Sequence, residues 1–195
     1  MDFFTPAMRA LQDRHDGRRL ADRLNERRVH DAFLDADIAQ IAAARFFFLA
    51  TAADGFVDCS FKGGDPGFVR VVGPSTLEWD DLDGNSMYRS LGNIASGGNV
   101  GLLFVPFDGT GLRLRINGRA EVIDDASADG RAIGARALVR VTATHIYPNC
   151  PRYIPRMAMD AVSPYVPRAG VETPVPEWKT RDYIVGVLPG TYPEK

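Results

Sequence analysis

The sequence predicts a mainly β protein, an antiparallel β-barrel with flanking helices. Three observations predict this class. About seven apolar or alternating segments follow one another at spacings of about 8 to 12 residues, most of them are joined by short hairpin turns, and little helix lies between them. A parallel sheet would need a long crossover, usually a helix, between successive strands. The spacing therefore favours the antiparallel barrel.

The N-terminal part of the chain is predicted to be helical over residues 18–45. Leu20 and Leu24 lie one helical turn apart, and Asp35 or Asp37 is a candidate N-cap for the second half of this segment. Acidic residues alternate with the arginines of the first half, so local ion pairs on a solvated face are the better interpretation than a nucleic-acid surface.

Two hairpins are predicted next. Residues 46–52 (FFFLATA) form a short apolar run, Asp54-Gly55 is a hairpin turn signal, and residues 57–62 (VDCSFK) alternate apolar with polar side chains. The second hairpin spans residues 68–80, where FVRVV and TLEWD flank a Gly-Pro-Ser turn.

A short helix and three further strands complete the expected elements. Tyr88, Leu91 and Ile94 recur at helical spacing, and Gly97-Gly98 ends the helix. The strands are expected at residues 100–107 (VGLLFVPF), 112–122 (LRLRINGRAEV) and 138–146. We expect a single domain with N-terminal helices over 1–44, the barrel over 45–147 and a proline-rich C-terminal arm over 148–195.

Composition excludes several classes of protein. The chain has 195 residues, 45% hydrophobic and 25% charged, with a formal net charge of −2, which is typical of a soluble globular protein without the basic excess of a nucleic-acid binder. No apolar run reaches the roughly 18 residues that a membrane span needs. Cys59 and Cys150 form no C-x-x-C pair. We expect a cytoplasmic protein with neither a nucleic-acid nor a membrane partner.

Common catalytic and metal motifs are absent. The sequence has no P-loop, no dinucleotide-binding glycine fingerprint, no nucleophile elbow and no zincin motif. Residues 81–85 resemble the start of a calcium loop, but Gly92 stands where the distal glutamate ligand is needed. An ordinary polar loop is the better interpretation, and no metal site is predicted.

Cationic residues on strands and at a helix start point instead to an anionic ligand. Lys62 ends a strand and precedes the glycine-rich loop 63–67, whose backbone amides are candidates for anion binding. Arg89 and Ser90 lie in the first turn of the short helix, where free N–H groups favour a phosphate. Arg113 shares a strand face with a second arginine. On spacing alone, an anion site and a set of solvated charges are equally supported.

The order of the segments FFFLATA, VDCSFKGG, TLEWDD, YRSLGNIASGGNVGLLF and LRLRINGRAEV resembles the pyridoxamine 5′-phosphate oxidase-like family of flavin-nucleotide-binding split barrels. The similarity spans residues 40–156 and is greatest to the branch with GGDPGFVRV and YPNCPRYI stretches. It implies a six- to seven-stranded antiparallel split β-barrel, FMN as cofactor, and a homodimer with flavin at the interface.

The resemblance also implies flavin-contacting positions. The motif on the second strand ends at Lys62, which is implied to meet the FMN phosphate, and Val57 stands where the family has an arginine. At the short helix, Ser90 replaces the second of two cations. The implied cofactor-binding residues are Val57, Asp58, Cys59, Ser60, Phe61, Lys62, Asp80, Asp81, Arg89, Ser90 and Arg113.

The implied function is FMN-dependent oxidation or reduction of an unidentified small molecule. Vitamin B6 oxidation is not expected, because the C-terminal segment lacks the arginine and histidine that position pyridoxamine phosphate in the oxidase. The alternatives are a non-catalytic carrier or sensor of flavin, F420 or haem, with His145 or Cys59 as axial ligand of a haem, and a ligand-free scaffold. No catalytic residue is assigned; Tyr147, Cys150 and Arg152 are candidates only through their place in the YPNCPRYI turn.

Overall fold

The computed structural model describes residues 2–109, 111–124 and 131–189. Its helices are α1 (Pro6–Arg14), α2 (Arg18–Arg28), α3 (Asp35–Ala43), α4 (Arg89–Gly97), the 3-10 helix η1 (Glu177–Thr180) and α5 (Asp182–Val185). Its strands are β1 (Phe46–Ala53), β2 (Phe56–Gly63), β3 (Val69–Gly73), β4 (Thr76–Asp81), β5 (Asn99–Phe104), β6 (Arg113–Ile123) and β7 (Ala137–Asn149).

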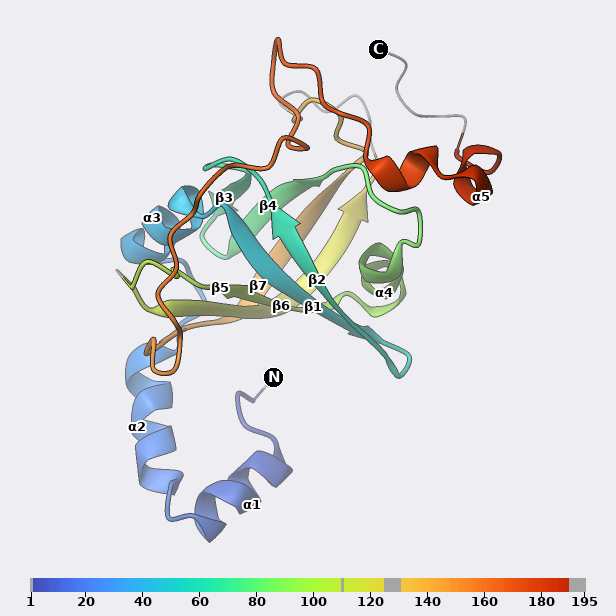
Figure 1. Cartoon of the computed structure of the whole chain (residues 1–195). Helices are drawn as coiled ribbons and strands as arrows, with labels where there is room; N and C mark the ends of the chain where they lie inside the picture. Colours follow the sequence, from blue (N-terminus) through green and yellow to red (C-terminus); the bar gives the residue numbers. More distant parts are fainter. Residues whose placement is uncertain (1, 110, 125–130, 190–195) are drawn as a thin grey trace.

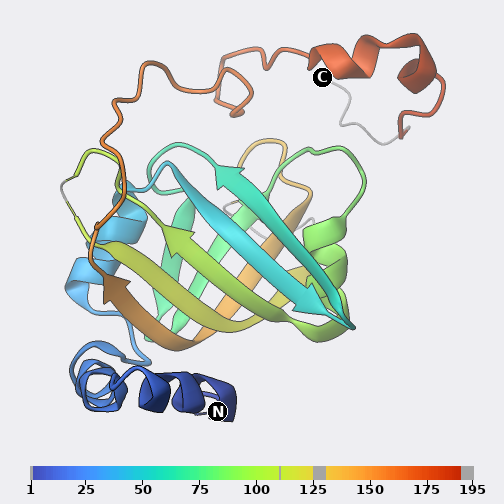
Figure 2. The ribbon, with the colours of Figure 1, turned by 60° about the horizontal axis from the view of Figure 1, so that its bottom comes forward.

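The strands form one antiparallel sheet in the order β2-β1-β5-β6-β7-β4-β3, which curls into a barrel (Figures 1 and 2). The two edge strands of this sheet are β2 and β3. A sheet that curls without joining its edges is a split barrel, so the predicted mainly β, antiparallel split-barrel fold is confirmed.

Strand alternation fills the barrel interior with apolar side chains. On β6, Leu114 and Ile116 are buried while Arg115 between them is exposed. Phe47 of β1 and Trp79 of β4 meet edge to face in this core, with ring centroids 5.1 Å apart. The core thus joins the two ends of the sheet, which are far apart in strand order.

The N-terminal helices differ in part from the sequence expectation. Between α2 and α3 the chain is extended, because the backbone of His30 pairs with Ile146 of β7. Leu34, and neither Asp35 nor Asp37, is the N-cap of α3. The Asp37 carboxylate instead accepts a hydrogen bond from the backbone N–H of Leu34 at 3.0 Å. Helix α1 lies before the segment 18–45 that the sequence predicts to be helical, and within the N-terminal region 1–44 in which helices are expected.

Two elements position the cavity described below. Helix α4 packs against β1, β2 and β6, and its C-cap Gly98 has φ of 68°, a left-handed conformation that favours glycine. After β7 the C-terminal arm leaves the barrel and runs across one end of it to α5 (Figure 2). Among the helices described, none combines the length and the apolar character needed to cross a bilayer.

Candidate functional site

A cavity of about 680 Å³ lies beside the edge strand β2. Its walls come from β2, the end of β4, the loop 82–88, the start of α4 and a stretch of the C-terminal arm. Pockets for small molecules and cofactors have volumes of about 300–1,000 Å³. The cavity therefore has the size of a cofactor site and is assembled from segments far apart in the sequence.

Three polar side chains of β2 face this cavity. Asp58, Ser60 and Lys62 alternate along the strand and therefore share one face of the sheet. The register pairs Ser60 with Leu49 and Lys62 with Phe47, both of which point into the core. The face that is apolar on β1 is thus polar on β2, at the open side of the barrel.

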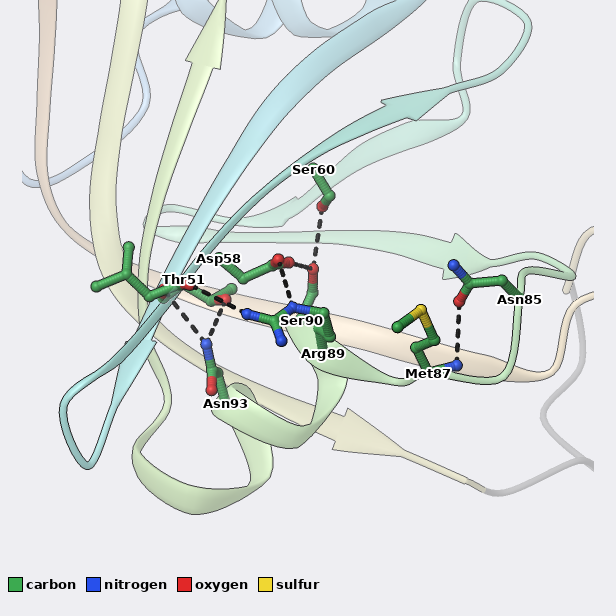
Figure 3. A network of polar contacts seen from close by, with 9 residues as sticks. Thr51, Asp58, Ser60, Asn85, Met87, Arg89, Ser90 and Asn93 are labelled. Atoms are coloured by element: carbon green, nitrogen blue, oxygen red, sulfur yellow. Dashed lines mark hydrogen bonds and ion pairs between the residues drawn. The ribbon is translucent and has the colours of Figure 1, made fainter.

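Asp58 connects β2 with the first turn of α4 (Figure 3). Its carboxylate accepts hydrogen bonds from the Ser90 hydroxyl at 2.7 Å and from Arg89 Nε at 3.1 Å, and the hydroxyls of Ser60 and Ser90 lie 3.0 Å apart. The hydrogen bond from Ser90, followed by that from Arg89, lowers the pKa of Asp58 below its ordinary value. Asp58 is therefore an ionised acceptor at neutral pH.

An ion pair connects β2 with β4 across the cavity. Lys62 Nζ lies 3.0 Å from the Asp81 carboxylate, and both side chains are mostly buried. These two strands are not neighbours in the sheet, so the pair links the open side of the barrel through side chains alone. The adjacent Asp80 also borders the cavity, but its carboxylate is paired with Arg70 at 2.7 Å.

Helix α4 begins at the cavity wall, where Arg89, Ser90 and Leu91 all line the cavity. The first backbone N–H groups of a helix have no partner within it and form, with the helix dipole, a favourable environment for an anion. Tyr88 precedes the helix with φ of 50°, a left-handed conformation, and its side chain also lines the cavity.

Besides Asp80, four of the predicted residues lie outside the polar cluster formed by Asp58, Ser60, Lys62, Asp81, Arg89 and Ser90. Val57, Cys59 and Phe61 occupy the outer face of β2 and are exposed, although Phe61 also borders the cavity. The Phe61 ring stacks on Phe46 at 5.2 Å. Arg113 lies on the outer face of β6 and donates through Nε to the Cys150 carbonyl at 3.2 Å.

Two backbone amides of the glycine-rich loop 63–67 already have partners within the protein. The backbone N–H of Gly64 donates to the carbonyl of Arg45, and that of Gly67 donates to the carbonyl of Ala42, both at 2.9 Å. These amides are occupied by contacts that fix the loop to the end of α3. The loop instead presents Asp65, which binds the C-terminal arm.

The candidates for haem ligation lie outside the cavity. The His145 ring packs against Phe3, with centroids 5.2 Å apart, and Cys59 lies on the outer face of β2. Among the described residues that line the cavity there is no histidine or cysteine. Over the described ranges, no three His, Cys, Asp or Glu side chains are grouped so as to hold a metal ion.

Two parts of the cavity wall were not anticipated from the sequence. Trp79 lines the cavity with a buried indole N–H that has no hydrogen-bond partner. Strand alternation places Trp79 on the same face of β4 as the predicted residue Asp81, and this alternation is the signal that could have identified Trp79 as a cavity residue. The second part is residues 159–168 of the C-terminal arm. No local pattern shows where an extended segment packs.

Comparison with known proteins identifies the family. A model of the pyridoxamine 5′-phosphate oxidase family matches residues 34–150. The chain belongs to this family. The matched part of this family member contains α3, α4 and the seven described strands, and the C-terminal arm after residue 150 lies outside it. A comparison with curated proteins gave no match.

Solved structures similar to this family member share low sequence identity with it. HupZ of Group A Streptococcus is 17% identical, with 60% of this chain and 94% of that chain covered and a TM-score of 0.46. A FAD-binding protein from Mesorhizobium loti is 14% identical (62% and 96% covered, TM-score 0.40). A FAD binding protein from Mycobacterium smegmatis is 16% identical (60% and 96% covered, TM-score 0.41).

Proposed function

We propose that the cavity beside β2 binds FMN and that the protein is a flavin-dependent oxidoreductase acting on a small molecule. One observation supports this most directly. The Lys62 ammonium, the Arg89 guanidinium and the first backbone amides of α4 bring several donors to one end of a cofactor-sized cavity. Family membership makes a flavin the first candidate ligand, and FMN rather than another flavin is the proposal.

The donor set fits a phosphate. An ammonium and a guanidinium carry several N–H groups, so Lys62 and Arg89 each have donors beyond those used by Asp81 and Asp58. The backbone amides at the start of α4 add neutral donors. The two carboxylates balance the two cations, so the phosphate is held by directed hydrogen bonds rather than by excess positive charge.

The rest of the wall fits a planar ring. Phe61, Phe68, Trp79 and Tyr88 border the cavity, and aromatic side chains bind flat apolar surfaces through large contact areas. The unpartnered N–H of Trp79 is a donor available to a ring heteroatom. A bound flavin supplies the electron or hydride chemistry, and the chain's residues bind, orient and shield the ring.

The first experiment is an absorption spectrum of the protein purified without added cofactor, with mass spectrometry of whatever is released on denaturation. FMN and riboflavin, which lacks the phosphate, are then titrated into cofactor-free protein. Replacing both Lys62 and Arg89 by alanine should weaken FMN binding by about 10-fold or more, since each charge-assisted hydrogen bond contributes roughly 1.5–3 kcal/mol. Riboflavin affinity should not change.

The exposed α2 cation Arg27 offers a matched control, because Arg27→Ala removes a charge far from the cavity. A wild-type protein that takes up no FMN, or an equal loss of riboflavin and FMN in the double variant, would contradict the proposal. FMN that binds but accepts no electrons from nicotinamide or other donors would identify a flavin carrier or sensor instead of an oxidoreductase.

We also propose that the protein is a homodimer with flavin near the interface. The outer face of β1 and β2 presents an apolar surface with Val57 70% and Phe61 61% exposed, beside Phe46 and Phe48. A second copy would cover this surface and the unpaired edge of β2. The predicted residues on the outer faces of β2 and β6 would then be near the interface. These residues are Val57, Cys59, Phe61 and Arg113.

Sedimentation analysis tests the dimer. Phe61→Glu places a charge in the proposed interface and should yield a folded monomer with weakened FMN binding. Leu20→Glu in α2 makes the same kind of change at a side chain that is 65% exposed, away from β1 and β2, and should leave the dimer intact. A monomeric wild-type protein with full FMN affinity would refute the dimer.

A further inference from the structure

Part of the cavity wall is built by the C-terminal arm. Met159, Ala161, Val162, Tyr165 and Val166 line the cavity from this side. The arm lies outside residues 34–150, the part that matches the family model. The family model therefore does not cover this part of the cavity wall.

Two ion pairs attach the arm to the rim of the cavity. Arg168 donates from Nε and from Nη2 to the two carboxylate oxygens of Asp65, at 2.7 and 2.8 Å, in a bidentate arrangement. Further along, the buried Lys179 is paired with Asp83. Asp65 follows β2 and Asp83 follows β4, so the arm is attached on both sides of the opening. Bidentate arginine pairs also fix orientation, which holds the segment before Arg168 in place.

The cations near this wall already have acidic partners. Arg168 and Arg45 share Asp65, at 2.7 and 3.8 Å, and Arg136 lies 2.5 Å from Asp83. The arm side chains of residues 159–166 that line the cavity carry no charge, so an anionic ligand placed against them gains no cationic partner from this wall. Most of these side chains, which precede the Arg168 anchor, are apolar, so the wall favours an uncharged molecule.

We infer that residues 159–166 of the arm form the substrate-side wall of the cavity and select uncharged, flat, mainly apolar molecules over anionic ones. This inference rests on the proposed function, because the selected molecule is the one placed against the bound flavin ring. A dianionic substrate such as a sugar phosphate or a pyridoxal phosphate derivative is disfavoured by the same wall, because its charge would lie against uncharged and mainly apolar side chains.

The test compares two probes of similar shape, 2-naphthol, which is uncharged at neutral pH, and the 2-naphthoate anion. Each is titrated by calorimetry into protein saturated with FMN. The wild type should bind 2-naphthol about 10-fold or more tightly than 2-naphthoate, since an unpaired charge is costly in an apolar site. Val162→Lys adds a cation to the wall and should shift this ratio about 10-fold toward 2-naphthoate.

Val175→Lys is the matched control. Val175 lies in the same arm, is 67% exposed and does not line the cavity, so the ratio should stay at the wild-type value. Equal affinities of the wild type for the two probes, or equal effects of the two lysine substitutions, would overturn the inference. If FMN itself does not bind, the proposed function fails; the same two titrations on the FMN-free protein then decide the selectivity of the wall by the same ratios.

Discussion

Asp58 is an acid placed where an FMN phosphate would bind, and Asp58→Asn should therefore tighten FMN binding. The carboxylate now uses the Ser90 hydroxyl and Arg89 Nε as donors (Figure 3). Asparagine has nearly the same shape and its carbonyl oxygen still accepts from Ser90. The substitution thus removes a negative charge and the acceptor of Arg89 Nε, while the hydrogen bond from Ser90 still connects β2 with α4.

The magnitude follows from the distance between the two anions. A phosphate bound on the far side of the Arg89 guanidinium lies roughly 6 Å from the Asp58 carboxylate, one guanidinium and two hydrogen bonds away. Two like charges at that distance repel by about 0.7 kcal/mol in water and about 3 kcal/mol at an effective dielectric constant near 20. Salt screening roughly halves this energy and the second phosphate charge roughly doubles it. We expect Kd for FMN to fall by about 3- to 100-fold.

Calorimetric titration of cofactor-free protein with FMN and with riboflavin measures this effect. Riboflavin has no phosphate, so its affinity should be the same in the wild type and in Asp58→Asn. Asp22→Asn serves as the control, because it changes the net charge equally at an exposed site in α2. Unchanged or weaker FMN binding by a folded Asp58→Asn protein would refute the placement of the phosphate beside Arg89.

Three further outcomes can be checked independently. Gly118→Ala should lower the free energy of unfolding by about 1–3 kcal/mol in urea, because the added Cβ would lie 2.3 Å from a backbone oxygen. Gly92→Ala is the contrasting change: the added Cβ meets open space in α4, so this variant should be more stable by about 0.5–1 kcal/mol. The hydrogen bonds from Arg168 lower the pKa of Asp65 below its ordinary value, so the ion pair stabilises the attached arm above about pH 4. This stabilisation is lost as the pH falls through the lowered pKa, and hydrogen exchange should then show weaker protection of the arm's amides. The backbone N–H of Arg152 lowers the pKa of the exposed Cys150 thiol, so mass spectrometry should find Cys150 alkylated by iodoacetamide at neutral pH, and an unmodified thiol would contradict this.

Local patterns were sufficient for the strands and for the short helix. On β6, the alternation of Arg113, Leu114, Arg115 and Ile116 already separates a buried face from an exposed one. The period of two is a property of neighbouring residues, so it can be read without knowing what the strand packs against. The same alternation implied that Asp58 shares a face with Lys62.

The partners of these side chains were decided only by the tertiary structure. Lys62 meets Asp81, Asp58 meets the start of α4, and Asp65 meets Arg168 across 103 positions of the chain. Each contact depends on the order of strands in the sheet or on the course of the arm, and neither leaves a periodic signal in the sequence. The sequence by itself indicated the strands, the short helix and which side chains of a strand share a face. Only the tertiary structure brought β2, β4, α4 and the arm around one cavity, because side chains distant in sequence meet only where the curled sheet places them.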